Sequence, residues 1–505
     1  MEKGLQKYFL IIFFLDSATV IEFIIHTEKA PVRSDRPRRA RLRKGYITME
    51  KNLTSGGVFK NILLFSLPYL LSYFLQTLYG MADLFIIGQF EGVASTTSVS
   101  VGSQVMHMLT VMIVGLAMGS TVSIGQAVGG KDKKGAAASI GNTVTLFMCL
   151  SVALTVVLLI FVRPIVNVMS TPKAAVSGTV DYLTICFTGI PFITAYNIIS
   201  SIFRGMGDSK SPMYFVAAAC AANIALDYLF MGALHMGPSG AALGTTLSQA
   251  FSVVIALIVI RRQSGALSVK KEDFRPAGPV MGKILKIGIP VAMQDGLIQI
   301  AFIVITVIAN RRGLNDAAAV GIVEKIISFL FLVPSSMLST VSALGAQNIG
   351  AGKPERARLT LRYASLIAIG FGAFIVLLMQ FAAEPVVSLF TDSTQADGAE
   401  VIRLGGQYMR GYVWDCIFAG IHFSFSGYFC ACGKSGLSFL HNITAILLVR
   451  VPGVYLTSVL FPDTLLPMGL ATSMGSLLSV IICVIAYTVI TRKSAGSSRK
   501  RLPAS

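Results

Sequence analysis

Long apolar runs fill the chain, and short polar stretches separate them. Most runs are roughly 20 to 28 residues long, and a helix of that length, rising 1.5 Å per residue, crosses about 30 Å of hydrocarbon. The pattern predicts twelve membrane-spanning helices, of which the second and the eighth extend beyond the bilayer. The predicted spans are residues 61–87, 96–128, 137–161, 179–203, 213–232, 239–260, 284–309, 317–348, 359–381, 401–428, 436–458 and 467–490.

The first half of the chain is echoed in the second. KNILLFSLP, which ends at Pro68, is similar to GKILKIGIP, which ends at Pro290, and GQAVGGKDKKGA is similar to AQNIGAGKPERA after the eighth span. Weaker echoes follow in the same order, 221 to 229 residues apart. Repeats in parallel order predict an all-α membrane protein whose twelve transmembrane helices form two six-helix bundles related by pseudo-two-fold symmetry.

The polar stretches set the expected domain boundaries. They delimit an amino-terminal lobe at 49–260, a cytoplasmic linker at 261–283, a carboxyl-terminal lobe at 284–491 and a basic cytoplasmic tail at 492–505. Residues 1–48 fit neither lobe, because Asp16 and Glu22 interrupt their apolar run. We expect translation to start at Met49; a signal-like segment and an amphipathic arm are the alternatives.

Composition and charge agree with a membrane protein. Of the 505 residues, 54% are hydrophobic and 13% are charged, which is too apolar for a soluble domain of this size. After residue 48, one set of alternate loops, with the tail, holds 24 lysines and arginines, and the other set holds 5. The positive-inside rule therefore places both termini in the cytoplasm, and we expect a plasma (inner) membrane location. The net charge of +18 is then a topology signal and not a nucleic-acid footprint.

Several kinds of chemistry lack support in the sequence. GYFCACGKSG fails as a phosphate-binding loop, because five residues stand where four are needed and no strand precedes it, so we expect neither ATP use nor an enzyme. The seven cysteines and five histidines show no metal-site spacing, so we expect no metal and no cofactor. The glycines of GLAMG and GQAVG favour close helix packing over ligand binding.

Two aspartates interrupt the apolar spans of the first half. Asp83 and Asp227 both fall in the predicted outer half of their spans, and Tyr79 and Asn223 each precede one of them by a helical turn. Two carboxylates in a low-dielectric site do not both ionise easily, so together they can hold a proton or a sodium ion. The structural alternative is that each aspartate only hydrogen-bonds a neighbouring helix.

At these residues the sequence resembles the multidrug and toxic compound extrusion (MATE) family. The resemblance rests on YGMADLFIIGQF, GQAVGGKD, FRGMGDSKSP, NIALDYLF and GPSGAALGT in this order, and it covers nearly the whole chain from Met49. It implies twelve helices in two V-shaped lobes and antiport of a substrate against protons or sodium ions. By match to the family's amino-lobe site, the ion-binding carboxylates would be Asp83 and Asp227. The same cavity would be lined by Asn223, Thr245, Tyr79 and Asn197.

The acids of the second half match the family less securely. Some members carry essential acids in the seventh and tenth spans, where this chain has Asp295 and Asp415, and Glu324 lies in the eighth span. Lys325 is adjacent to Glu324, and Arg410 precedes Asp415 by five residues. We expect internal ion pairs to explain most of these charges, because an unpaired buried charge costs several kcal/mol. Asp415 stays a candidate for a second cation site.

The expected function is secondary active export. We expect a monomer that moves hydrophobic, cationic small molecules across the bilayer by alternating access, driven by H⁺ or Na⁺; carboxylates and amides serve both ions, so the choice stays open. One alternative is a flippase for a lipid-linked saccharide or a lipid; the saccharide flippases should have more cationic residues along their cavity. A remote alternative is a membrane prenyltransferase, because NIALD fits the first of its two aspartate motifs, although the second motif is absent.

Overall fold

A computed structural model describes residues 51–262, 269–391 and 397–499, all within the compact unit Thr48–Ser505. These residues form helices and no strands, as predicted for an all-α membrane protein. Helices satisfy every backbone hydrogen bond inside the segment, which is what a long apolar run requires in lipid. The predicted extension at 1–48 lies outside the described residues.

The first half contains eight α-helices, and a short turn of π-helix, η2 (Tyr228–Ala233), follows the seventh of them. The α-helices are α2 (Val58–Phe90), α3 (Val93–Gly129), α4 (Lys133–Ile160), α5 (Val162–Val168), α6 (Val176–Thr188), α7 (Ile190–Gly205), α8 (Lys210–Asp227) and α9 (Gly237–Arg262). Two 3₁₀ turns, η1 (Lys173–Ala175) and η3 (Lys271–Phe274), lie before α6 and in the predicted linker.

The second half repeats this order, again with a π-helical turn, η4 (Ile446–Arg450), in its fifth span. Its α-helices are α10 (Gly278–Asn310), α11 (Leu314–Leu330), α12 (Leu332–Gly350), α13 (Pro354–Val387), α14 (Gly398–Tyr412), α15 (Asp415–Ala431), α16 (Gly436–Ala445), α17 (Val451–Leu460) and α18 (Leu466–Arg499).

Length and composition identify ten continuous membrane-spanning helices among the described residues. The pair α6 and α7 makes an eleventh, bent by 49°. The bend falls at Gly189 and just before Pro191, whose ring cannot donate a backbone hydrogen bond. The predicted span at 401–428 consists of α14 and α15, which have 15 and 17 residues and are each too short to cross alone.

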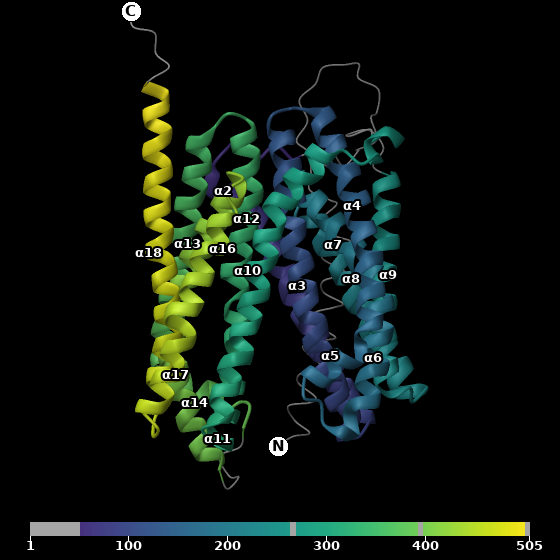
Figure 1. The fold of residues 1–505 in the computed structure, drawn as a ribbon, viewed down its shortest axis with the longest axis vertical. Coiled ribbons are helices and arrows are strands. Elements are labelled where there is room, and N and C mark those ends of the chain that lie inside the picture. Colours follow the sequence, from purple (N-terminus) through teal and green to yellow (C-terminus); the bar gives the residue numbers. More distant parts are fainter. Residues whose placement is uncertain (1–50, 263–268, 392–396, 500–505) are drawn as a thin grey trace, which may run out of the picture. The chain divides into compact units, whose positions relative to one another are not determined.

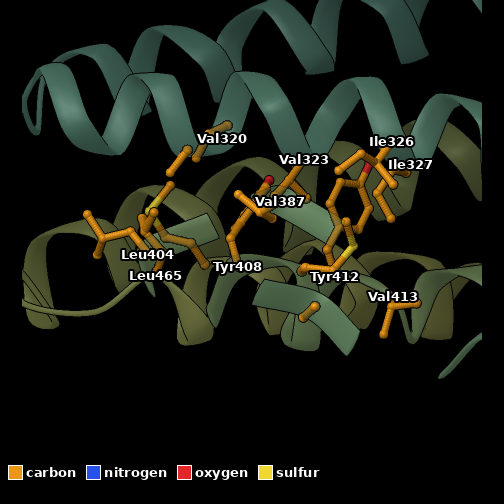
Figure 2. Packing of buried hydrophobic residues seen from close by; sticks show 14 of the residues in the cluster. Val320, Val323, Ile326, Ile327, Val387, Leu404, Tyr408, Tyr412, Val413 and Leu465 are labelled. Atoms are coloured by element: carbon orange, nitrogen blue, oxygen red, sulfur yellow. The ribbon is translucent and has the colours of Figure 1, made fainter. Parts of the chain in front are cut away.

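The two halves form two lobes with separate hydrophobic cores. Figure 1 shows α3 to α9 on one side and α11 to α18 on the other. In the second lobe, side chains from α11, α13, α14 and α18 pack around two fully buried tyrosines, Tyr408 and Tyr412 (Figure 2). A buried aromatic ring of this size removes a large apolar area from its surroundings, so it anchors the packing of several helices at once.

The first helix of each half crosses between the lobes. Val58 and Phe65, at the start of α2, pack in a cluster with second-half residues, whereas Ile87 belongs to the core of the first lobe. In α10, Ile284 packs against first-half residues and Ile305 belongs to the second core. A domain boundary placed in the linker therefore does not separate the packing of the two lobes. Each crossing helix contains an internal proline, at positions 68 and 290.

The ends of α3 and α12 that the charge pattern places in the cytoplasm approach each other closely. A Cβ atom on Gly129 would overlap the carbonyl oxygen of Gln347, and one on Gly350 would overlap that of Gln126. The packing role predicted for the glycine of GQAVG is therefore what Gly129 performs. Only residues without a side chain allow two backbones to come this near.

Two glutamines bridge the lobes at the same level. Gln126 Nε2 donates to the carbonyl of Ala431 at 2.8 Å, and Gln347 Nε2 donates to the carbonyl of Gly205 at 3.1 Å. The two bonds are equivalent under the repeat, since each joins the second helix of one half to the fourth span of the other. We call these two bonds the glutamine clasp.

Candidate functional site

Two buried carboxyl groups meet inside the first lobe. Asp83 lies near the end of α2 and Asp227 is the last residue of α8, with 3% and 0% of their surfaces exposed. Their side chains lie close enough to interact electrostatically. Adjacent carboxylates repel each other, so the pair is stable when it holds a proton or another cation between its members.

The groups around the two acids leave several polar atoms without partners. The hydroxyl of Thr245, on α9, donates to Asp83 Oδ2 at 3.1 Å. Asn223 is fully buried beside Asp83. Its amide, the second oxygen of Asp83 and both oxygens of Asp227 make no hydrogen bond of regular geometry with the described residues. Buried polar atoms are rarely left in this state, so this cluster is a candidate site for a cation.

Backbone features position Asp227. The α-helix α8 ends at this residue and continues as the π-helical turn η2, a departure that often marks functional sites. Gly244 faces it from α9, where a Cβ atom would overlap Asp227 Oδ1. Gly244 was not among the predicted site residues, although its position immediately before Thr245 in the sequence was a usable signal.

The remaining first-lobe candidates lie at different distances from this pair. Tyr79 lies one helical turn before Asp83 and interacts with it electrostatically. It also lies beside Gln249, a polar residue of α9 that was not among the predicted site residues. Asn197 is placed elsewhere: its amide donates to the Ile193 carbonyl of its own helix at 2.8 Å, and it lines a small cavity between α2 and α7. The structure thus gathers Asp83, Asp227, Asn223 and Thr245, with Tyr79 next to them, and leaves Asn197 in the neighbouring cavity.

The second-half acids do not form a comparable pair. Asp295 accepts a long hydrogen bond from Gln294 at 3.4 Å and lies against Gly115 of α3, at the contact between the lobes. Glu324 accepts from the hydroxyl of Thr306 at 3.2 Å. Neither acid is among the ion pairs of the described residues, so Lys325 is not the salt-bridge partner of Glu324.

Asp415 is neutralised internally. It is fully buried, and its Oδ2 pairs with Arg450 Nη2 at 2.5 Å; the same nitrogen donates to Ser476 at 3.0 Å. The ion pair was expected, but its partner was not the nearby Arg410, which instead pairs with Glu384 at 3.0 Å. Arg450 ends the π-helical turn η4 and packs against Gly475 of α18, much as Asp227 packs against Gly244.

The donor set in the first lobe consists of oxygen and amide groups. Such ligands suit a proton or a hard cation and are poor ligands for thiophilic metals. Across the described ranges, no group of three or more histidines, cysteines and acids is arranged to hold a metal ion.

Comparison with known proteins identifies the family of this chain. The family model MatE matches residues 68–229 and 290–456, about two thirds of the chain. This protein belongs to the MATE family. The two matched segments begin at Pro68 and Pro290, one in each half, as the internal repeat predicts.

Several known proteins are similar to this one along most of its length. The probable multidrug resistance protein YoeA of Bacillus subtilis is 26% identical over 82% of this chain and 89% of its own length. The multidrug export protein MepA of Staphylococcus haemolyticus is 24% identical, with coverages of 75% and 82%. A multidrug resistance MATE family transporter of the MOP superfamily, solved in an outward-facing conformation, has a TM-score of 0.79 at 21% identity and covers 87% of this chain and 98% of its own. This structural likeness shows the fold.

Proposed function

We propose that this MATE protein exports hydrophobic, cationic small molecules in exchange for H⁺ or Na⁺ bound at Asp83 and Asp227. The observation that carries the proposal is the pair of adjacent, fully enclosed carboxyl groups surrounded by unpartnered polar atoms. The named relatives, which are described as multidrug resistance and multidrug export proteins, support drug-like substrates. The protein acts as a monomer in the plasma membrane, with both termini in the cytoplasm, and catalyses no chemical reaction.

The coupling step is an exchange of charge at the carboxyl pair. With a cation bound, the pair carries less negative charge and can remain enclosed in the lobe. When the cation leaves, the acids repel each other and attract a cationic substrate, so occupancy by ion and by substrate compete. Ion binding on one side and release on the other then drives substrate in the opposite direction.

The glutamine clasp bears on which side of the membrane the substrate site is closed to in the described conformation. It joins the lobes at the ends that we expect to face the cytoplasm, so in the proposed cycle the described state is the one closed on that side. Alternating access requires the clasp to break when the substrate site opens to the cytoplasm. The prolines at positions 68 and 290, where α2 and α10 cross between lobes, leave each crossing helix without one backbone hydrogen bond.

The test measures movement of a fluorescent lipophilic cation in proteoliposomes under a proton gradient alone and then a sodium gradient alone. Asp83→Asn and Asp227→Asn should each reduce gradient-driven transport at least about 100-fold, since an amide cannot exchange a cation at this site. Asp181→Asn, which alters an exposed acid on α6, is the matched control and should transport normally. Transport that survives both site substitutions would refute the proposed coupling role.

A further inference from the structure

Residues 51–56, which precede α2 and which we call the strap, bind the first lobe at the end that holds the glutamine clasp. The backbone N–H of Lys51 donates to the carbonyl of Met206 at 3.1 Å, and its ammonium group donates to Asp208 at 2.9 Å. Gly207 lies between these two acceptors, and a Cβ atom there would clash with the carbonyl oxygen of Lys51. The first residue of the strap therefore fits closely onto the turn between α7 and α8.

The rest of the strap binds the second lobe. The ammonium group of Lys353 donates to the carbonyl of Thr54 at 2.9 Å. The guanidinium of Arg356, on α13, donates to the next two carbonyls of the strap at 3.3 and 3.1 Å. Leu53 is buried in the same hydrophobic cluster as Leu344 of α12. A run of six residues thus holds on to both lobes, with most of its contacts on the second.

Gln347 connects the strap to the glutamine clasp. Its side-chain oxygen accepts from the backbone N–H of Leu53 at 3.2 Å, while its Nε2 donates to Gly205 in the clasp. The side chain of Gln126, its equivalent in the first half, makes only the bond to Ala431 among the described residues. If the lobes separate at this end, the strap stays with the second lobe, and the bonds that Lys51 makes to the first lobe have to break.

The corresponding segment before α10 contains no such bridge. Asn142 of α4 accepts from the backbone N–H of Ala277 at 2.7 Å, and Thr145 donates to the carbonyl of Phe274 at 2.7 Å. Within the described ranges, the hydrogen bonds that residues 269–277 make to other parts of the chain all go to α4, in the first lobe. The repeat therefore does not require a bridge at this position, and the one that the strap makes calls for an explanation of its own.

We propose that the strap is a latch that holds the lobes together at the clasp end, and that release of Lys51 from the α7–α8 turn is a step of opening. This inference rests on the alternating access of the proposed function, but not on which ion or substrate is moved. The Lys51 side chain is 45% exposed, so its ion pair with Asp208 is weak enough to break reversibly. The latch then sets the populations of the closed and open conformations from outside the candidate ion site.

Native cysteines report whether this end of the molecule opens. Cys430 is 1% exposed, and it lies in a cluster with Met118 of α3 and Ile287 of α10. Separating the lobes at this end would therefore uncover its thiol. Cys186 and Cys416 are fully buried in the separate cores of the first and the second lobe, so they become accessible only if a lobe itself unfolds.

The experiment measures how fast N-ethylmaleimide labels each cysteine of the full-length protein in detergent, with peptide mass spectrometry as the readout. Lys51→Met, which keeps the length of the side chain but removes its charge, should label Cys430 about threefold faster than the parent. Loss of a partly exposed ion pair shifts a two-state equilibrium by roughly that factor. Cys186 and Cys416 should label at the parent's rate.

Two matched variants are the controls. Lys51→Arg keeps a cation on the strap and Lys60→Met removes an exposed lysine of α2, so both should label Cys430 as the parent does. An unchanged rate in Lys51→Met would overturn the latch, and so would faster labelling of the two core cysteines, because the change would then reflect unfolding. Normal transport in Asp83→Asn would refute the proposed coupling role and leave the latch in place.

Discussion

Each lobe has a π-helical turn next to a charged residue that packs against a glycine, but the residue is an acid in the first lobe and an arginine in the second. In the first lobe a π-helical turn begins after Asp227, which packs against Gly244 of the last helix; in the second a π-helical turn ends at Arg450, which packs against Gly475 of the last helix. Asp227 meets another acid, whereas Arg450 meets Asp415. An acid pair needs a cation from outside, while an ion pair supplies its own. Under the proposed function, the first lobe exchanges its cation during transport, whereas the second lobe keeps the cation that its own arginine supplies.

Removing the internal cation should have the largest effect on stability. Arg450→Gln leaves Asp415 buried without its counter-ion, so the free energy of unfolding should fall by about 3 to 5 kcal/mol. Asp227→Asn should not lower it, because that change relieves repulsion between two acids. Thermal and denaturant unfolding in detergent measure both.

Arg410→Gln is the matched control for this contrast. It breaks a pair with Glu384 in which both side chains are partly exposed, 32% and 42%, and such a pair contributes about 1 kcal/mol or less. Equal destabilisation by Arg450→Gln and Arg410→Gln would contradict the claim that the buried pair is a structural element of the second lobe.

The two packing glycines allow a sharper comparison of intermediate size. Gly244→Ala places a methyl group on the Asp227 carboxylate, and Gly475→Ala places one on the Arg450 side chain. Overpacking of this kind costs about 1 to 3 kcal/mol, so both variants should unfold more easily. Only Gly244→Ala should also weaken the dependence of transport on the ion gradient.

The control is Gly475→Ala, whose transport is measured as a function of the concentration of the coupling ion. Its transport should retain the parent's half-saturating ion concentration even if its maximal rate falls. A shift of that concentration as large as in Gly244→Ala would mean that the two turns are functionally alike.

The smallest effect should come from the single hydroxyl that supports Asp83. Thr245→Val removes the donor at 3.1 Å, and a hydrogen bond of this type contributes about 1 kcal/mol, or roughly a fivefold change in apparent ion affinity. Thr246→Val is the control, since the neighbouring buried hydroxyl makes no hydrogen bond among the described residues. If both variants titrate like the parent, Thr245 is not part of the ion site.

The sequence predicted what depends on composition and on local spacing. Lengths of apolar runs were enough for the helical architecture, and the echo between Pro68 and Pro290 was enough for the two halves. Burying a carboxylate in an apolar span costs free energy, and this was enough to single out Asp83 and Asp227, which the structure brings together. Their role in ion coupling stays a prediction.

The sequence did not predict the features that depend on how the helices are rotated relative to one another. The partner of Asp415 is 35 residues away on another helix, and sequence proximity pointed to Arg410 instead. Asn197 lines the neighbouring cavity, and its position in the sequence did not show which way its side of α7 faces. The break between α14 and α15 falls at Val413 and Trp414, neither of which is a proline or a glycine, although Gly411 precedes it by two residues.

The glutamine clasp also constrains how the two halves can diverge. Both of its bonds end on main-chain carbonyls, which every residue possesses, so substitutions at the acceptor positions leave the acceptor atom in place. An insertion or deletion in α3 or α12 would instead move a donor by 100° around its helix and away from its acceptor. Gln126 and Gln347 are 221 residues apart, as are Gly129 and Gly350. Duplicated halves held by such contacts can lose most of their shared residues while their spacing stays fixed.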